Sequence, residues 1–128
     1  MEKGKFKMFF IDRLSDRILC YGQKSYNFKR RKVMIKVVAK HAVKEDMIEK
    51  ALELFGELVK ESRKEENCIK YELYQDSEND SVMTMIEEWE NKESLEKHFN
   101  TSHFTKLVPE IGKLLEGGAE ISVYKKVI

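Results

Sequence analysis

Residues 68–89 read CIKYELYQDSENDSVMTMIEEW, and this stretch decides the fold. In residues 68–75 the apolar side chains Ile69, Tyr71 and Leu73 alternate with charged ones, which is typical of a half-buried strand. Residues 76–81 have the polar composition of a turn, and residues 82–89 form a second strand. The stretch therefore predicts two strands joined by a short turn.

The segment before this stretch predicts a strand and a helix. Residues 34–43 are rich in β-branched side chains, which favours a strand. In residues 45–64 the apolar side chains recur at intervals of three and four, so one stripe of a helix is apolar. Asn67 follows as a stop signal.

The segment after it predicts two helical pieces and a last strand. Asn91 is a good N-cap for a short helix, and Thr101 or Ser102 caps a second one. Because proline disrupts a helix interior, we expect a break near residue 108, with Pro109 in the first turn of the last piece. The glycine pair at 117–118 ends that piece, and residues 119–127 form a strand.

The order β-α-β-β-α-β is the ferredoxin-like split pattern of an α+β domain, with an antiparallel sheet and helices on one face. In the strand at 82–89, Val82 and Ile86 point one way, and Met83, Met85 and Trp89 point the other. Since the helices cover one face only, we expect a second sheet to cover the apolar residues on the other. This predicts a homodimer joined through Met83, Met85 and Trp89.

Composition limits the possible classes of protein. Charged residues make up 37% of the 128, and no run approaches the ~18 apolar residues of a spanning helix. The two cysteines, Cys20 and Cys68, exclude a disulfide-dense scaffold and a four-cysteine zinc site. Phosphate loops, GxGxxG, HExxH and nucleophile elbows are missing from the sequence, which disfavours the common cofactor enzymes. We expect a cytoplasmic protein without a cofactor or a membrane contact.

The charge is unevenly distributed. Residues 1–33 carry a net charge of +7, and residues 34–128 carry −6. We interpret residues 1–33 as an extension, either an unstructured tail or a leader misread as protein. Arg30 and Arg31 could be encoded as a ribosome-binding sequence just before Met34. A basic binding arm and a real extra element remain alternatives, but nucleic acid is not the expected partner. Residues 34–128 form the domain.

Five residues are candidates for a site. Trp89 either fills the core or walls a pocket for a flat aromatic ligand, and Glu87 lies on the same strand face. His98 is on the apolar side of its helix, as a core residue or a general base near neutral pH. His103 caps the next helix or reaches the site, and Tyr71 can face the same cavity. The two histidines with Glu87 do not match a known ligand spacing, so no metal is expected.

Residues 34–128 contain, in order, these short motifs: Glu66-Asn67-Cys68-x-x-Tyr71, Glu87-Glu88-Trp89, Leu95-x-x-His98-x-x-x-Ser102-His103-Phe104, Pro109 and Leu114-Leu115. Their order and spacing resemble those of the antibiotic biosynthesis monooxygenase family of dimeric α+β barrels. The resemblance covers residues 34–128.

The resemblance implies oxidation of a quinol or polyphenol by dioxygen without a cofactor. An ionised polyphenol is electron-rich enough to reduce dioxygen, so the protein needs a dry pocket, a base and donors for the developing oxyanion. His98 is then the base or proton shuttle, Trp89 the pocket wall, and Glu87 or His103 the orienting groups. Tyr71 completes the substrate-binding set.

Other branches of the family fit less well. Haem-degrading members need an asparagine, a tryptophan and an axial histidine where this chain has Lys40-His41, His98 and Val108. An isomerase of a phosphorylated dione shares the paired histidines His98 and His103, but no phosphate ligands can be assigned. A non-catalytic small-ligand-binding dimer is the alternative from a different class.

Overall fold

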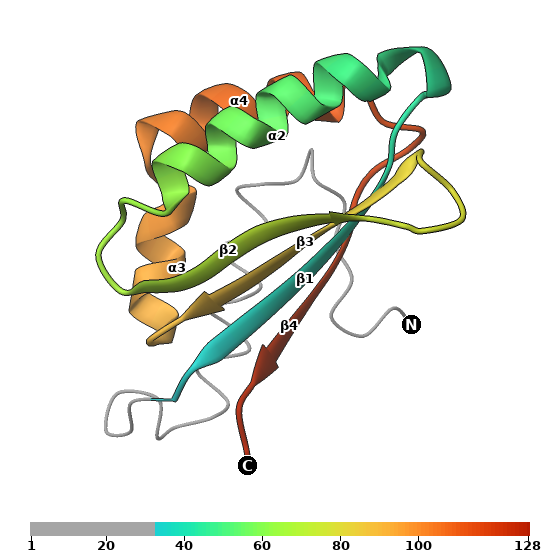
Figure 1. The fold of residues 1–128 in the computed structure, drawn as a ribbon. Helices are drawn as coiled ribbons and strands as arrows, with labels where there is room; N and C mark the ends of the chain where they lie inside the picture. Colours follow the sequence, from blue (N-terminus) through green and yellow to red (C-terminus); the bar gives the residue numbers. More distant parts are fainter. Residues whose placement is uncertain (1–32) are drawn as a thin grey trace.

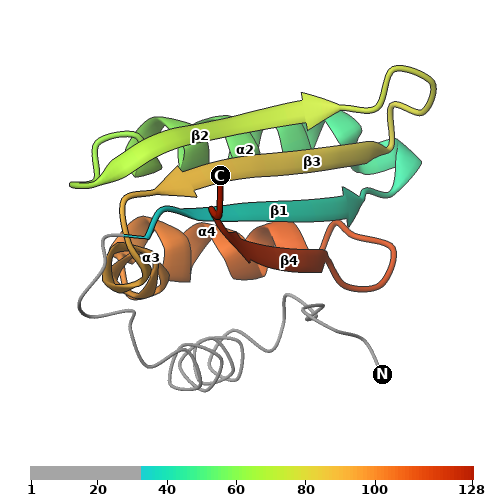
Figure 2. The same ribbon diagram turned by 90° about the horizontal axis from the view of Figure 1, so that it is seen from below.

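The computed structural model describes residues 33–128, in which a single sheet organises the chain. The elements, in chain order, are β1 (Ile35–Ala42), the 3-10 turn η2 (Glu45–Met47), α2 (Ile48–Ser62), β2 (Cys68–Gln75), β3 (Val82–Trp89), α3 (Lys92–Phe99), α4 (Ser102–Gly112) and β4 (Glu120–Lys125). The strands pair antiparallel in the order β2-β3-β1-β4 (Figure 2). This is the predicted ferredoxin-like α+β fold. The expected extension at 1–33 lies outside the described residues except for Val33.

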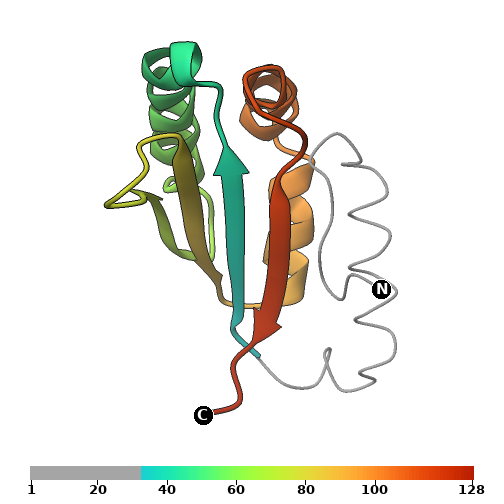
Figure 3. The same ribbon diagram turned by 90° about the vertical axis from the view of Figure 1, so that its right-hand side faces the viewer.

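The helices α2 and α4 pack side by side on one face of the sheet (Figure 1). Seen from the end, α2 lies nearer β2 and α4 lies nearer β4 (Figure 3). In α2 the buried residues recur along one stripe: Ala51, Phe55, Leu58 and Ser62. Within residues 33–128, no helix combines the length and apolar character that crossing a membrane requires.

The predicted boundaries of the strands at 68–75 and 82–89 are confirmed. The helix expected over 45–64 is divided, because Met47 leaves helical geometry with φ of −115° and ψ of 7°. The chain enters β2 through Asn67, which has a positive φ of 66°. Asparagine tolerates this left-handed conformation better than most residues do.

The expected helix break near Val108 is wrong. The helix α4 continues through Pro109 to Gly112. Proline removes the hydrogen bond to the carbonyl of Thr105, but Thr105 and Pro109 are both exposed, so water can replace it. The helix also ends before the expected glycine pair, and just beyond its end the carbonyl of Leu114 accepts a hydrogen bond from the amide of Lys44.

The prediction that Met83, Met85 and Trp89 form a dimer interface is also wrong. All three side chains lie under the helices of their own chain and are at most 2% exposed. The alternation in β3 was correctly predicted, but its apolar face was assigned to the wrong side of the sheet. The opposite face, seen in Figure 2, holds the half-buried Val38 and Ile86 as neighbours across β1 and β3.

Candidate functional site

The corner between α3 and α4 fixes the position of a histidine. Asn91 caps α3 by accepting a hydrogen bond from the backbone of Ser94, as predicted. Thr101 caps α4 by accepting from the backbone of Phe104, and its hydroxyl donates to the carbonyl of His98 at 2.7 Å. These local bonds hold His98, which is completely buried and whose ring contacts Tyr71 of β2 and Trp89 of β3.

His98 lies in a hydrogen-bonded series with Glu65 and Tyr71. Its Nδ1 is 2.6 Å from Glu65 Oε2, and its Nε2 is 3.3 Å from the Tyr71 hydroxyl. Because an ionised carboxylate only accepts, Nδ1 carries a proton, and in the neutral ring Nε2 accepts from the tyrosine. Burial alone raises the pKa of Glu65, but the hydrogen bonds from His98 and His103 outweigh it and hold that pKa below its usual value. Glu65 is therefore the anionic end of the series.

His103 converges on the same carboxylate oxygen. Its Nε2 lies 2.6 Å from Glu65 Oε2 and 3.2 Å from the hydroxyl of Thr101. The rings of His98 and His103 are 6.1 Å apart between centroids. Glu65, His98 and His103 thus place three potential metal-ligand atoms within 4.8 Å of one another. The carboxylate in this group is Glu65, and not the Glu87 that the sequence suggested.

Trp89 and Glu87 form the sheet side of the site. The indole Nε1 of Trp89 donates to Glu87 Oε2 at 2.9 Å, and its ring lies 4.7 Å from that of His98. Burial raises the pKa of Glu87, although His98 and the indole hydrogen bond oppose this shift. Burial likewise raises the pKa of Tyr71 well above its usual value. Both groups are therefore inclined to keep their protons.

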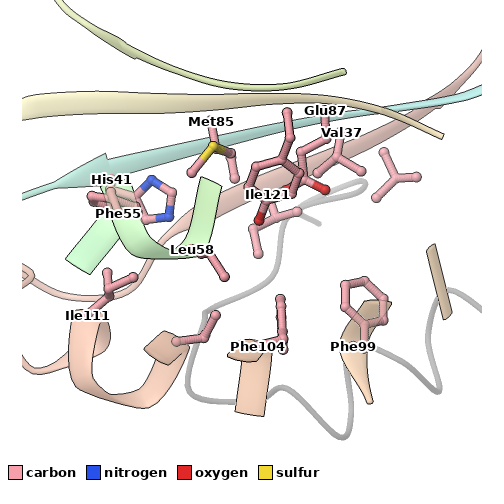
Figure 4. A pocket seen from close by; sticks show the side chains of 14 residues that line it. Val37, His41, Phe55, Leu58, Met85, Glu87, Phe99, Phe104, Ile111 and Ile121 are labelled. Carbon is pink, nitrogen blue, oxygen red and sulfur yellow. The ribbon is translucent and has the colours of Figure 1, made fainter. Parts of the chain in front are cut away.

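A cavity of about 40 Å³ lies between the sheet and the helices (Figure 4). Its polar lining comes from His41, Tyr71 and Glu87, one from each of three strands. The rest of the lining is apolar: Val37, Ala39, Phe55, Leu58, Met85, Phe99, Phe104, Val108, Ile111, Ile121 and Val123. A volume of this size holds one or two waters, or a molecule as small as dioxygen.

Two of the five predicted site residues line this cavity, and three lie behind it. Tyr71 and Glu87 are at the wall, whereas Trp89, His98 and His103 are not. Trp89 does not wall this cavity, and its expected role at a pocket stays a prediction. Its ring sits beside His98 and Tyr71, and these two side chains fill the space at the end of β3.

His41 is a cavity residue that the sequence analysis did not select. It is buried on β1, where its Nδ1 donates to the carbonyl of Met83 at 3.2 Å and its ring meets that of Phe55 edge-on. Burial lowers the pKa of His41 to about 4, so the imidazole is neutral near pH 7. The signal was present in the alternation of β1, which places His41 on the same face as Ile35.

The chain is similar in sequence and in fold to known proteins. A sequence model of the family described as antibiotic biosynthesis monooxygenase matches residues 34–110. A conserved protein of Methanosarcina mazei Go1, solved by crystallography, is 38% identical, with coverage of 75% of this chain and 95% of that one and a TM-score of 0.73. A crystal structure described as an antibiotic biosynthesis monooxygenase is 33% identical, with coverage of 73% and 99% and a TM-score of 0.71.

A curated protein of Synechocystis, described as uncharacterized, is 36% identical over 83 residues. The match covers 65% of this chain and 56% of the relative, so the chain spans little more than half of that protein.

Proposed function

The chain belongs to the antibiotic biosynthesis monooxygenase family, and from that premise we propose that it oxidises a quinol or another electron-rich polyphenol with dioxygen, without a cofactor. The observation that carries the proposal is the hydrogen-bonded series Glu65–His98–Tyr71, which ends at the wall of the cavity. This series is the acceptor that a phenolic proton requires.

Proton removal proceeds through Tyr71. The substrate hydroxyl donates to the Tyr71 oxygen while Tyr71 passes its own proton to Nε2 of His98. His98 becomes an imidazolium, and Glu65 stabilises that charge through Nδ1, as a carboxylate does in a catalytic triad. Tyr71 ends the step with a proton on its oxygen, so the high pKa of its hydroxyl is no obstacle. The substrate is left as an electron-rich phenolate.

The phenolate then reacts with dioxygen in a water-poor space. The lining is mostly apolar, which suits dioxygen and limits side reactions with water. Overall, the quinol gains one oxygen atom and loses two hydrogen atoms, which leave with the second oxygen atom as water. Glu87 lies at the cavity wall, and its raised pKa favours the protonated form that can supply a proton to the departing oxygen.

An aromatic substrate requires the cavity to enlarge. The present volume of about 40 Å³ is well below the roughly 300 Å³ of the smaller common ligand pockets. Phe99, Phe104 and Ile121 each retain 7% exposure, more than most of the other lining residues. We therefore assign the entrance to the side of the cavity where α3, α4 and β4 meet.

The proposal includes a homodimer that uses the open face of the sheet. Val38 and Ile86 are apolar and only half-buried there, and a second copy would remove them from water. This surface replaces the one predicted from Met85 and Trp89.

The proposal is tested by measuring dioxygen uptake with a panel of hydroquinones and anthrones. We expect uptake with at least one compound, together with formation of an oxygenated quinone in equal amount. Saturable binding of these compounds without dioxygen uptake would support the non-catalytic binding module instead. If the compounds neither bind nor cause dioxygen uptake, the proposed substrate class is contradicted.

A further inference from the structure

The polar cluster at the α3–α4 corner has a second property that proton transfer does not use. Both imidazoles direct a nitrogen at one oxygen atom of Glu65, each at 2.6 Å. A carboxylate can accept two hydrogen bonds on two separate oxygens, but here both imidazoles use the same oxygen. As a result, three atoms of the kind that bind metals lie close together. We propose that Glu65, His98 and His103 form a binding site for a transition-metal ion of the zinc class.

The chemistry of the donors selects the ion. Two imidazole nitrogens with one carboxylate oxygen suit zinc and its neighbours, whereas magnesium and calcium prefer oxygen ligands. Three protein ligands leave a fourth tetrahedral position for water. The side chains of His103 and Glu65 are 17% and 13% exposed, so that position is reachable from solvent, while His98 closes the buried side.

The distances allow an ion after a small adjustment. A tetrahedral zinc with bonds of about 2.1 Å separates its ligand atoms by about 3.4 Å. Each nitrogen therefore has to move away from Glu65 Oε2 by less than about 1 Å from its present 2.6 Å, and the two nitrogens, which lie within 4.8 Å of each other, have to come to about 3.4 Å apart. Side-chain rotations of Glu65 and His103 can supply this, since both are partly exposed.

The backbone presents the ligands in a fixed arrangement. His98 and His103 are held across the corner by Thr101, which bonds to the carbonyl of one and contacts the ring of the other. The loop that carries Glu65 is also tied down, because its amide donates to the carbonyl of Ser62 and its own carbonyl accepts from Cys68. Preorganisation of this kind is what a tight metal site requires.

Tyr71 supplies an outer contact of the type that metal sites use. An ion on Nδ1 of His98 moves the ring proton to Nε2, which then donates to the Tyr71 oxygen at the present 3.3 Å. The same proton position prevents Nε2 from accepting a proton from Tyr71. Metal binding and the proposed proton transfer therefore exclude one another, although the metal site does not depend on whether a quinol is oxidised.

The test is zinc binding to the untagged full-length chain after chelator treatment. Isothermal titration is expected to give one zinc ion per chain, and zinc is expected to raise Tm. Glu65→Gln and His103→Gln keep side-chain size but each remove a ligand, so each is expected to raise the Kd by about 100-fold or more. Glu66→Gln changes the neighbouring exposed carboxylate and is expected to keep wild-type affinity.

The zinc titration does not depend on enzymatic activity. Failure of the quinol assay would therefore not contradict the metal site. Circular dichroism of Glu65→Gln and His103→Gln shows whether each variant is folded. Equal zinc affinity in wild type and in both ligand variants would overturn the assignment, as would the absence of stoichiometric zinc binding by the wild type.

Discussion

Removing one buried hydroxyl, with Tyr71→Phe, separates proton transfer from the rest of the site. Tyr71 is 2% exposed, and the ring of phenylalanine fills the same space, so the cavity and the packing against Trp89 are retained. The hydroxyl that contacts His98 Nε2 at 3.3 Å is the only group lost. Any change in turnover then reports on that oxygen atom.

The expected magnitude follows from the role of the hydroxyl. Loss of a general base or its relay lowers kcat by about 10²-fold or more, which corresponds to about 2.7 kcal/mol in the barrier. KM is expected to change little, because the apolar lining that holds the ring is unchanged. Stability is expected to fall by about 1 kcal/mol, since the buried Nε2 of His98 loses its donor. For a domain of this size, that lowers Tm by roughly 4–8 °C.

The matched control is Tyr74→Phe on the same strand. Tyr74 is 53% exposed, and its hydroxyl donates to Glu72 at the surface. Dioxygen uptake and thermal unfolding are measured for wild type and both variants with the best quinol. The control is expected to match wild type in both measurements.

Retention of more than about half of wild-type kcat in Tyr71→Phe would refute the relay. An equal loss in Tyr71→Phe and Tyr74→Phe would also refute it, since the second hydroxyl has no contact with the cavity.

Three further outcomes follow from the structure. Trp89→Ala is expected to cost about 3–5 kcal/mol of folding free energy and His98→Ala less, measured by denaturant unfolding, because the indole is the larger buried group. His41 has a folded-state pKa of about 4, so only the unfolded chain gains its proton as pH falls from 6.5 toward 4. Wild type is therefore expected to lose about 2 kcal/mol more stability than His41→Leu between about pH 7 and pH 5. Ile86→Lys is expected to yield a folded monomer by light scattering, whereas Met85→Lys buries an unpaired charge and is expected to unfold the chain.

The fold was predicted well from the sequence because local patterns of alternation and capping indicate its strands and helices. The alternation in 68–75 and 82–89 gave both strands at their observed limits, and Asn91 acts as the predicted cap. Pro109 does not end α4, because the cost of a proline in a helix depends on whether the lost hydrogen bond faces water, which a local pattern does not reveal. The same limit affected Met85, since alternation shows that two faces differ but not which face the helices cover.

The site was predicted in part, and its central carboxylate was missed. The predicted residues Glu87, Trp89 and His98 do come together at the end of β3. Glu65 was missed because it stands beside Glu66 at a helix end, where both look like surface acids. Its partners lie 33 and 38 residues further along the chain, so only the tertiary structure distinguishes it from its neighbour.

Glu65 sets the direction of every hydrogen bond in the series that leads to the cavity. An ionised carboxylate can only accept, so Nδ1 of His98 carries a proton, and in the neutral ring Nε2 presents a lone pair. The Tyr71 hydroxyl then donates to Nε2, and the Tyr71 side chain lines the cavity. In the proposed mechanism the basic strength of the site thus originates at a partly exposed loop residue, while proton uptake occurs at a buried oxygen. A neutral glutamine at position 65 would allow either ring tautomer, and the Tyr71 oxygen would no longer be held as an acceptor toward substrate.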